Sequence, residues 1–167
     1  YFYLGTLTFK EWTSNFDISR EFDLGLVKPM FVAAGVEYRK SDFTIGVGQK
    51  ESYDTGPFRY PVGHPLATNL AAVAGGANGV SGFPPSTAGD FSRNNKSLYL
   101  NIEQALTDTF EISLAGRYED YSDFGTAETG KASLRWEPFP GYALRATAST
   151  GFRAPSLQQQ HYGPAST

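Results

Sequence analysis

The sequence predicts an all-β fold, an antiparallel up-and-down meander of about six strands that forms part of a larger transmembrane β-barrel. Apolar and polar side chains alternate with a period of two residues through most of the chain. Short and long connections follow one another in turn between the alternating segments. No apolar run reaches the roughly 18 residues that a membrane-spanning helix needs, which excludes a helical membrane protein.

The composition narrows the function classes. The 167 residues suffice for one domain, and 18 glycines and 10 tyrosines beside a single methionine favour strands and turns. The net charge is −3 and no basic stripe is present, so we expect no nucleic-acid partner. The absence of cysteine excludes a disulfide framework, thiol catalysis and cysteine-ligated zinc. No catalytic group and no phosphate-binding glycine loop stands out, so we expect neither an enzyme nor a cofactor.

The first two alternating segments, at 12–26 and 30–40, carry apolar residues at even positions and polar residues at odd positions. Only Ser14 and Arg20 interrupt the even face of the first segment, which otherwise consists of Trp12, Phe16, Ile18, Phe22, Leu24 and Leu26. The even face of the second consists of Val32, Ala34, Val36 and Tyr38. From Phe43 the parity reverses, which either a bulge near 39–42 or a departure from the membrane band would explain.

Four later segments, at 97–106, 110–120, 131–137 and 142–150, follow the same rule. Six charged residues that fall on the odd face, the last of them just after the final segment, are our candidates for contact with a barrel lumen: Glu103, Arg117, Glu119, Arg135, Arg145 and Arg153. In a barrel these would point into the polar lumen, which avoids the ~2–4 kcal/mol that a lysine or arginine facing mid-bilayer lipid would cost. Cross-strand ion pairs are the alternative role for most of them. The even-face aromatics that could lie at the membrane interfaces are Tyr38, Tyr118, Trp136 and Tyr142, of which Trp136 suits the periplasmic side.

The connections alternate in length. They are short at 26–29, very long at 49–96, short at 106–109, medium at 121–130 and short at 138–141. Outer-membrane barrels sort short periplasmic turns from long extracellular loops in this way, whereas a soluble β-sandwich has no reason to do so. We therefore expect the 49–96 loop to be extracellular.

Two smaller groups of residues have plain interpretations. His64 and His161 lie far apart in predicted loops, where we expect them to be solvated and not to bind metal. The acidic cluster of Glu119, Asp120 and Asp123 could attract calcium, but its spacing suits a turn rich in Asp, Ser and Gly better. No metal site is therefore predicted.

Four stretches, NFDISREFDLGL, AAGVEYRK, GRYEDYSDFG and LRATASTGFRAPSLQQQHY, resemble the β-barrel of TonB-dependent receptors. The most specific of these motifs consists of Gly151, Phe152, Arg153, Ala154, Pro155 and Ser156. We expect Gly151 to relieve crowding at the strand exit, Phe152 to continue the even face, Arg153 to continue the odd face and Pro155 to end ladder pairing. The alternative is that the motif shapes the strand exit and touches no ligand.

The resemblance implies an active transporter in the outer membrane of a Gram-negative bacterium, with membrane lipid and an extracellular nutrient as partners. The nutrient would be a scarce one such as a ferric siderophore, a cobalamin or an oligosaccharide. Residues 1–167 would be part of the barrel, and a plug domain absent from this chain would connect the receptor to the TonB complex. The lumen-facing charges would then contact the plug or the substrate. The alternatives are a secreted, soluble β-sandwich that binds carbohydrate, and a passive porin without a plug.

A sheet excised from such a barrel has two unpaired edges and an exposed apolar face. We therefore expect the isolated chain to self-associate.

Overall fold

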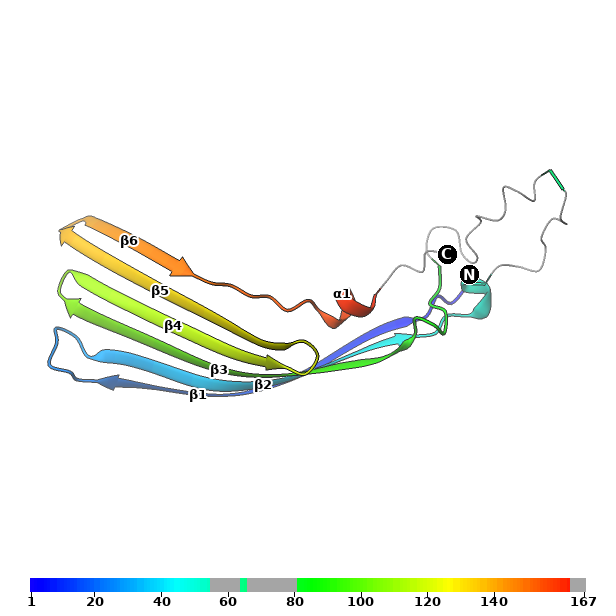
Figure 1. Ribbon diagram of the computed structural model, residues 1–167, viewed down its shortest axis with the longest axis horizontal. Helices are drawn as coiled ribbons and strands as arrows, with labels where there is room; N and C mark the ends of the chain where they lie inside the picture. The colour runs from blue at the N-terminus through cyan, green and yellow to red at the C-terminus, as the bar shows by residue number, and fades with distance from the viewer. Residues whose placement is uncertain (55–63, 66–80, 163–167) are drawn as a thin grey trace. The chain divides into compact units, whose positions relative to one another are not determined.

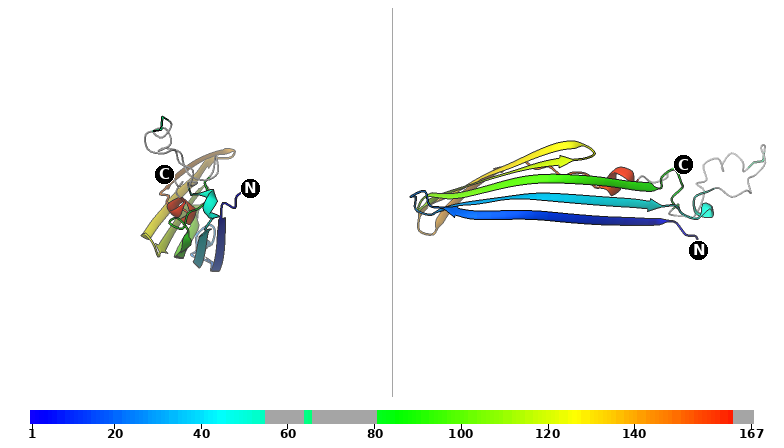
Figure 2. Two further views of the ribbon diagram at one scale, coloured as in Figure 1. Left: turned by 90° about the vertical axis from the view of Figure 1, so that its right-hand side faces the viewer. Right: turned by 90° about the horizontal axis from the view of Figure 1, so that it is seen from below.

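The computed structural model describes residues 1–54, 64–65 and 81–162. Six strands in this part of the chain form one sheet in the order β1-β2-β3-β4-β5-β6, so every strand lies beside its neighbour in sequence (Figure 1). The elements are β1 (Thr6–Phe22), β2 (Met30–Gly46), the 3-10 helix η1 (Lys50–Ser52), β3 (Gly89–Thr107), β4 (Phe110–Tyr121), β5 (Gly125–Phe139), β6 (Tyr142–Ser149) and the short helix α1 (Leu157–His161). The predicted antiparallel meander is confirmed, and the two further views in Figure 2 show the same succession of strands.

The chain divides into two compact units, which we describe separately. The larger unit consists of residues 11–40 and 93–154, and the smaller unit consists of residues 1–10, 41–92 and 155–167.

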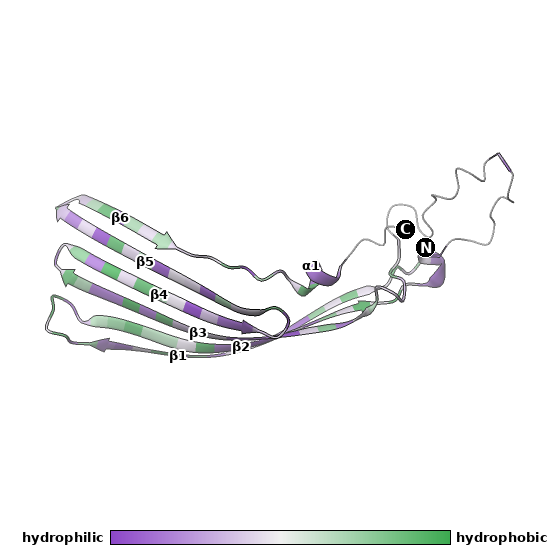
Figure 3. Cartoon of the chain, viewed as in Figure 1, coloured by the Kyte–Doolittle hydropathy of each residue, from purple (hydrophilic) through white to green (hydrophobic). Residues whose placement is uncertain are grey.

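In the larger unit, the strand register keeps residues of equal parity on one face, except beside two turns, where Thr107 stands opposite Phe110 and Phe139 opposite Tyr142. β3 pairs with β4 through Leu98↔Tyr118 and Ile102↔Leu114, and β4 pairs with β5 through Leu114↔Ala132. The same parity continues into β6. We call the face formed by even-numbered residues the apolar face and the opposite one the polar face, and their alternation is visible as coloured bands along each strand in Figure 3.

The strands extend further than the hydrophobic pattern predicts. β4 and β5 are joined by residues 122–124, where we expected a connection at 121–130. The connection from β2 to β3 covers 47–88 and not 49–96, and its residues 55–63 and 66–80 lie outside the described residues. Backbone pairing does not require apolar side chains, so the ladder continues where the alternation fades. Connection length therefore alternates less strictly than the sequence indicates.

The smaller unit has its own apolar core. Phe43, Ile45 and Leu157 are each no more than 3% exposed, and Phe83 and Phe91 pack against them. Phe43 and Ile45 share odd parity with Gly35, the other buried residue of β2. A bulge would move the buried positions of β2 from odd to even numbers, whereas these positions stay odd and only the odd-face side chains change from polar to apolar. The parity reversal is therefore better explained by β2 leaving the expected membrane band than by a bulge.

Helix α1, which the sequence analysis did not predict, supplies Leu157 to this core. Ser156 accepts a hydrogen bond from the backbone N–H of Gln159, and the Gln159 side chain accepts one from the backbone N–H of Ser156, which together form a capping box. His161 lies in this helix, and its ring stacks on Phe91 with 3.8 Å between ring centroids. The expectation of a loop histidine was therefore wrong.

Candidate functional site

Much of the apolar face of the larger unit is exposed. Many of its large side chains are between 40% and 68% exposed, among them Trp12, Phe16, Ile18, Val36, Leu98, Leu100, Leu114, Tyr118, Leu134, Trp136 and Leu144. No second sheet covers this face in the described part of the chain, where all six strands belong to one sheet. The β-sandwich alternative is not supported, because a sandwich buries one face of each sheet.

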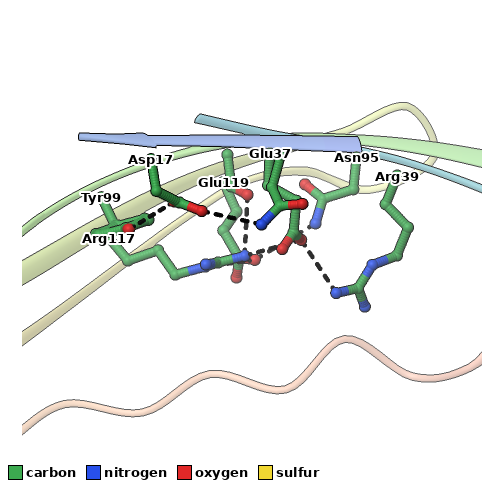
Figure 4. Close-up of polar contacts among 9 residues, drawn as sticks. Asp17, Glu37, Arg39, Asn95, Tyr99, Arg117 and Glu119 are labelled. Atoms are coloured by element: carbon green, nitrogen blue, oxygen red, sulfur yellow. Dashed lines mark hydrogen bonds and ion pairs between the residues drawn. The ribbon is translucent and has the colours of Figure 1, made fainter. Parts of the chain in front are cut away.

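A hydrogen-bonded network centred on Arg117 occupies the polar face (Figure 4). Arg117 Nη2 donates to Glu37 Oε1 at 3.2 Å and to Ser97 Oγ at 2.9 Å, while its Nε donates to Glu119 Oε1 at 3.1 Å. The side chains of Glu37 and Glu119 are mostly buried. One guanidinium on β4 thereby connects carboxylates of β2 and β4 with a hydroxyl of β3, and Arg39 adds a further ion pair to Glu37 at 3.0 Å.

A second part of the network connects β3 to β1 across β2. Tyr99 Oη donates to Asp17 Oδ1 at 2.6 Å (Figure 4). Gly35 of β2 lies close to both side chains. A Cβ at position 35 would lie 2.2 Å from that carboxylate oxygen and 2.5 Å from Cε1 of the Tyr99 ring. Position 35 therefore requires glycine for close approach, because any side chain would displace the ring and its hydrogen bond.

A hollow of about 500 Å³ lies next to Arg117. Most of its lining residues have odd numbers, which places it on the polar face. Those with polar side chains are Tyr99, Asn101, Arg117, Thr129, Lys131 and Ser149. Two cations among hydroxyl and amide groups can bind an anionic or hydroxyl-rich surface.

The six predicted lumen-facing charges do not form one site. Arg117 and Glu119 contact each other in the network. Glu103 accepts a hydrogen bond from Asn101 at 3.1 Å, and its strand partner is Ser113, away from the Arg117 network.

The remaining predicted charges lie elsewhere. Arg135 pairs with Glu137 and stands directly opposite Arg145 on β6. Arg153 follows β6 outside any strand. Arg117 thus forms a cross-strand ion pair with Glu37, as predicted for residues of this face. Arg135 instead pairs with Glu137 on its own strand.

Sequence reasoning did not single out five members of the network, namely Asp17, Glu37, Arg39, Ser97 and Tyr99. Their odd parity already placed them on the polar face, among many other odd residues. Which of them meet depends on the register between strands, and alternation alone does not specify register.

A second cluster lies at the turn between β4 and β5. The Arg93 guanidinium donates to both carboxylate oxygens of Asp123, from Nε at 2.9 and 2.8 Å and from Nη2 at 2.6 Å. The guanidinium carbon lies 5.1 Å from the ring centroid of Phe124 and 5.8 Å from that of Tyr121. Only 8% of the Arg93 side chain is exposed. Asp123 is therefore engaged by an arginine, in agreement with the turn interpretation of the acidic cluster.

The motif at 151–156 differs in detail from its expected role. β6 ends at Ser149, and the last strand-like bond runs from Thr150 N–H to the Gly130 carbonyl at 2.9 Å, so pairing stops before Pro155. A Cβ on Gly151 would meet nothing within 4 Å, and the expected crowding is absent.

Phe152 does not extend the even face of a strand either. It packs on the turn aromatics instead, with ring centroids 5.7 Å from Phe124 and 6.3 Å from Tyr121. Because β6 ends at Ser149, Phe152 is not in a strand, and the alternation of side chains between two faces does not apply to it.

Aromatic side chains lie toward both ends of the apolar face. Trp136 is paired with Phe110 on one side and Leu144 on the other, near the turn that precedes Tyr142. Toward the other end, Tyr118 lies opposite Leu98. Trp12 meets Tyr38 edge to face, with 5.8 Å between ring centroids, and Tyr38 Oη donates to Asn94 at 3.1 Å. The guanidinium of Arg20 lies over the Phe22 ring, 5.5 Å from its centroid, at the end of β1.

Within the described residues, no helix has the length and apolar character needed to cross a membrane. A family model described as "TonB dependent receptor-like, beta-barrel" matches residues 2–167. No solved structure matches the chain.

Proposed function

The chain belongs to the TonB-dependent receptor β-barrel family, and from this we propose that it forms part of the barrel wall of a receptor that imports a scarce nutrient across the outer membrane of a Gram-negative bacterium. A ferric siderophore, a cobalamin or an oligosaccharide would be such a nutrient. Receptors of this family reside in the outer membrane and depend on TonB. In this proposal, a plug domain outside this chain connects the barrel to the TonB complex.

The exposed apolar face carries the proposal. Exposing it to water is unfavourable by roughly 25 cal/mol per Å² of apolar surface, and monomeric soluble proteins seldom expose contiguous apolar patches larger than a few hundred Å². Lipid contact removes this cost, and the opposite face offers charged side chains to an aqueous lumen.

The height of the apolar face fits a bilayer. Phe110 and Tyr118 lie about 26 Å apart along β4 at ~3.3 Å per residue. A strand tilt of roughly 40° reduces this to a height of about 20 Å, which is of the same order as the roughly 25 Å apolar band of outer-membrane barrels. In this arrangement Trp136 and Tyr142 lie at the periplasmic interface, and Tyr38 and Tyr118 lie at the outer one. Arg20 then extends along Phe22 toward periplasmic headgroups.

The membrane orientation can be tested with two adjacent residues of β4. We would introduce Leu114→Cys and Ser113→Cys separately, label each with a fluorophore, and reconstitute the intact protein, freed of any other thiols, into vesicles that contain brominated lipid. Leu114 is half exposed on the apolar face and Ser113 lies on the polar face. We expect strong quenching at 114 and little at 113. Equal quenching at both positions, or at neither, would contradict a lipid-facing even side.

Active transport is distinguished from passive diffusion by its energy requirement. We expect nutrient uptake through the intact receptor to stop when the gene for TonB is deleted or when an uncoupler collapses the proton gradient, because the proposed plug moves only when TonB transmits force. Uptake would be measured with radiolabelled candidate nutrients in cells that carry or lack the receptor gene. Uptake that persists without TonB would favour the passive porin.

A further inference from the structure

The hollow beside Arg117 on the polar face contains polar groups that the Arg117 network does not use. Its described lining residues include two cations, Arg117 and Lys131, and no acidic residue. Within the described ranges, the side chains of Thr129, Lys131 and Ser149 take part in no hydrogen bond or ion pair. An ammonium group and two hydroxyl groups are therefore free to contact a ligand.

The strand register brings these groups together. Lys131 stands directly opposite Ser149 on β6 and Ala115 on β4, and Thr129 stands opposite Arg117. All five residues have odd numbers and lie on the polar face. Because the side chain of Ala115 is a single methyl group, it leaves room for a ligand between Arg117 and Lys131.

The charges around the hollow leave one cation uncompensated. The ion pairs of the network join two guanidinium groups to two carboxylates and are electrically neutral. Their members are Arg39, Arg117, Glu37 and Glu119. Lys131 adds one positive charge outside these pairs. The carboxylates of Asp17 on β1 and Glu103 on β3 are at least two strands away from Lys131 on β5.

A carboxylate matches this lining in charge and in hydrogen bonding. Its single negative charge balances Lys131, whereas a phosphate dianion would lack a second counterion. Its two oxygens can accept hydrogen bonds from the ammonium group and from the hydroxyl of Thr129 or Ser149. Arg117 donates from Nη2 and Nε within the network, and its Nη1 has no partner in the described part of the chain. This nitrogen can donate to the same carboxylate.

We propose that the hollow binds the carboxylate group of a ligand, with Lys131 as its counterion and Thr129 and Ser149 as hydroxyl donors. The carboxylate belongs either to the imported nutrient, such as an acidic sugar, or to an acidic side chain of the receptor outside residues 1–167. The inference deepens the proposed function and rests on it, because the hollow faces the proposed lumen.

Isothermal titration calorimetry of the intact receptor in detergent tests the nutrient as the source. The probes are glucuronate and glucose, two hexoses of which only glucuronate carries a carboxylate, and we expect only glucuronate to bind. Lys131→Gln should weaken its binding about tenfold by removing the counterion, and Lys131→Arg should retain most of it. Ala115→Leu should abolish binding by filling the hollow. Lys28→Gln, in the turn between β1 and β2, is the matched control and should leave binding unchanged.

Carbodiimide coupling of the intact receptor tests the internal source. The reagent joins an amine to a carboxylate in contact with it as an amide, and mass spectrometry of the digest identifies both peptides. If a side chain of the receptor occupies the hollow, Lys131 should be coupled to an acidic residue outside residues 1–167, and glucuronate should not bind. Lys131→Arg should then eliminate the coupled peptide, and Lys28 should not be coupled to the same residue.

Either result supports the carboxylate site and identifies its source. The proposal is wrong if neither glucuronate binding nor coupling depends on Lys131, or if Lys28→Gln weakens binding as much as Lys131→Gln does. Coupling of Lys131 to Glu103 or to another residue of 1–167 would also contradict it. Urea unfolding of each variant confirms that it is folded.

The two proposals fail separately. If Leu114→Cys is quenched while neither result is obtained at Lys131, the barrel assignment holds and the carboxylate site is wrong. If glucuronate binding depends on Lys131 while Leu114→Cys is not quenched, the membrane location is wrong and the site remains, because a soluble protein would present the same polar face.

Discussion

We expect Arg93→Met to lower the free energy of unfolding by about 2–3 kcal/mol. Methionine retains most of the apolar stem but removes the guanidinium that donates to both oxygens of Asp123 and lies over two aromatic rings. The loss falls below the ~3–5 kcal/mol of a fully buried pair because 26% of the Asp123 side chain is exposed. Urea titration of the refolded receptor in vesicles measures the change, and amide exchange at 121–125 locates it.

The partner substitution and the double substitution provide the control. Asp123→Asn should destabilise the protein by a similar amount, since the buried guanidinium loses the carboxylate that offsets its desolvation. Combining Arg93→Met with Asp123→Asn should recover part of the loss, because neither ion then remains without its counterpart. Strictly additive losses would show that the two side chains act independently and would contradict this account.

Arg117→Met should lower the free energy of unfolding by about 2 kcal/mol. The substitution removes the donor to Glu37, Ser97 and Glu119 at once and leaves two mostly buried carboxylates close together without the cation between them. Arg39 still pairs with Glu37, which limits the cost. Urea titration in vesicles is again the measurement.

Two variants separate charge from geometry in this network. Arg117→Lys keeps the charge but cannot donate in three directions from a planar fork, so we expect it to recover about half of the loss. Adding Glu119→Gln to Arg117→Met should also recover stability by removing one of the two like charges. A destabilisation that Glu119→Gln leaves unchanged would mean that Arg117 contributes only packing.

Alternation predicted the fold because the side-chain period of a strand is a local property. The even residues from Trp12 to Leu144 occupy one face as predicted, and the six strands follow one another in sequence order. Strand ends were predicted less well. Residues such as Gly89 to Lys96 alternate weakly, yet they belong to β3 because the backbone continues the strand regardless of side-chain polarity.

The sequence predicted on which face of the sheet the candidate-site residues lie, but not which of them contact one another. Parity correctly placed Arg117 and Glu119 on the polar face, but it also selected Glu103 and Arg145, which lie away from the network. Position 35 requires glycine because the hydrogen bond between Tyr99 and Asp17 crosses β2 at this residue. Which residue of β2 lies at this crossing depends on the register of β1, β2 and β3.

The motif at 151–156 shows the same limit. The predicted strand exit is present, although β6 already ends at Ser149. Ser156 then caps a helix whose Leu157 enters the core beside Phe43 and Ile45. The sequence shows that the apolar residues of this segment change from even to odd positions at Phe43 and Ile45. It does not show that Leu157, more than a hundred residues later, packs against them.

By itself, the sequence determined the all-β class, the strand order, the two faces and, through its motifs, the family. These properties follow from local periodicity and from short stretches of sequence. Only the tertiary structure decided which polar residues meet, where glycine is required, which arginine holds the 122–124 turn and what covers Phe43. Each of these depends on register and on contacts between distant segments, and a period of two residues is compatible with many registers that keep the same face apolar.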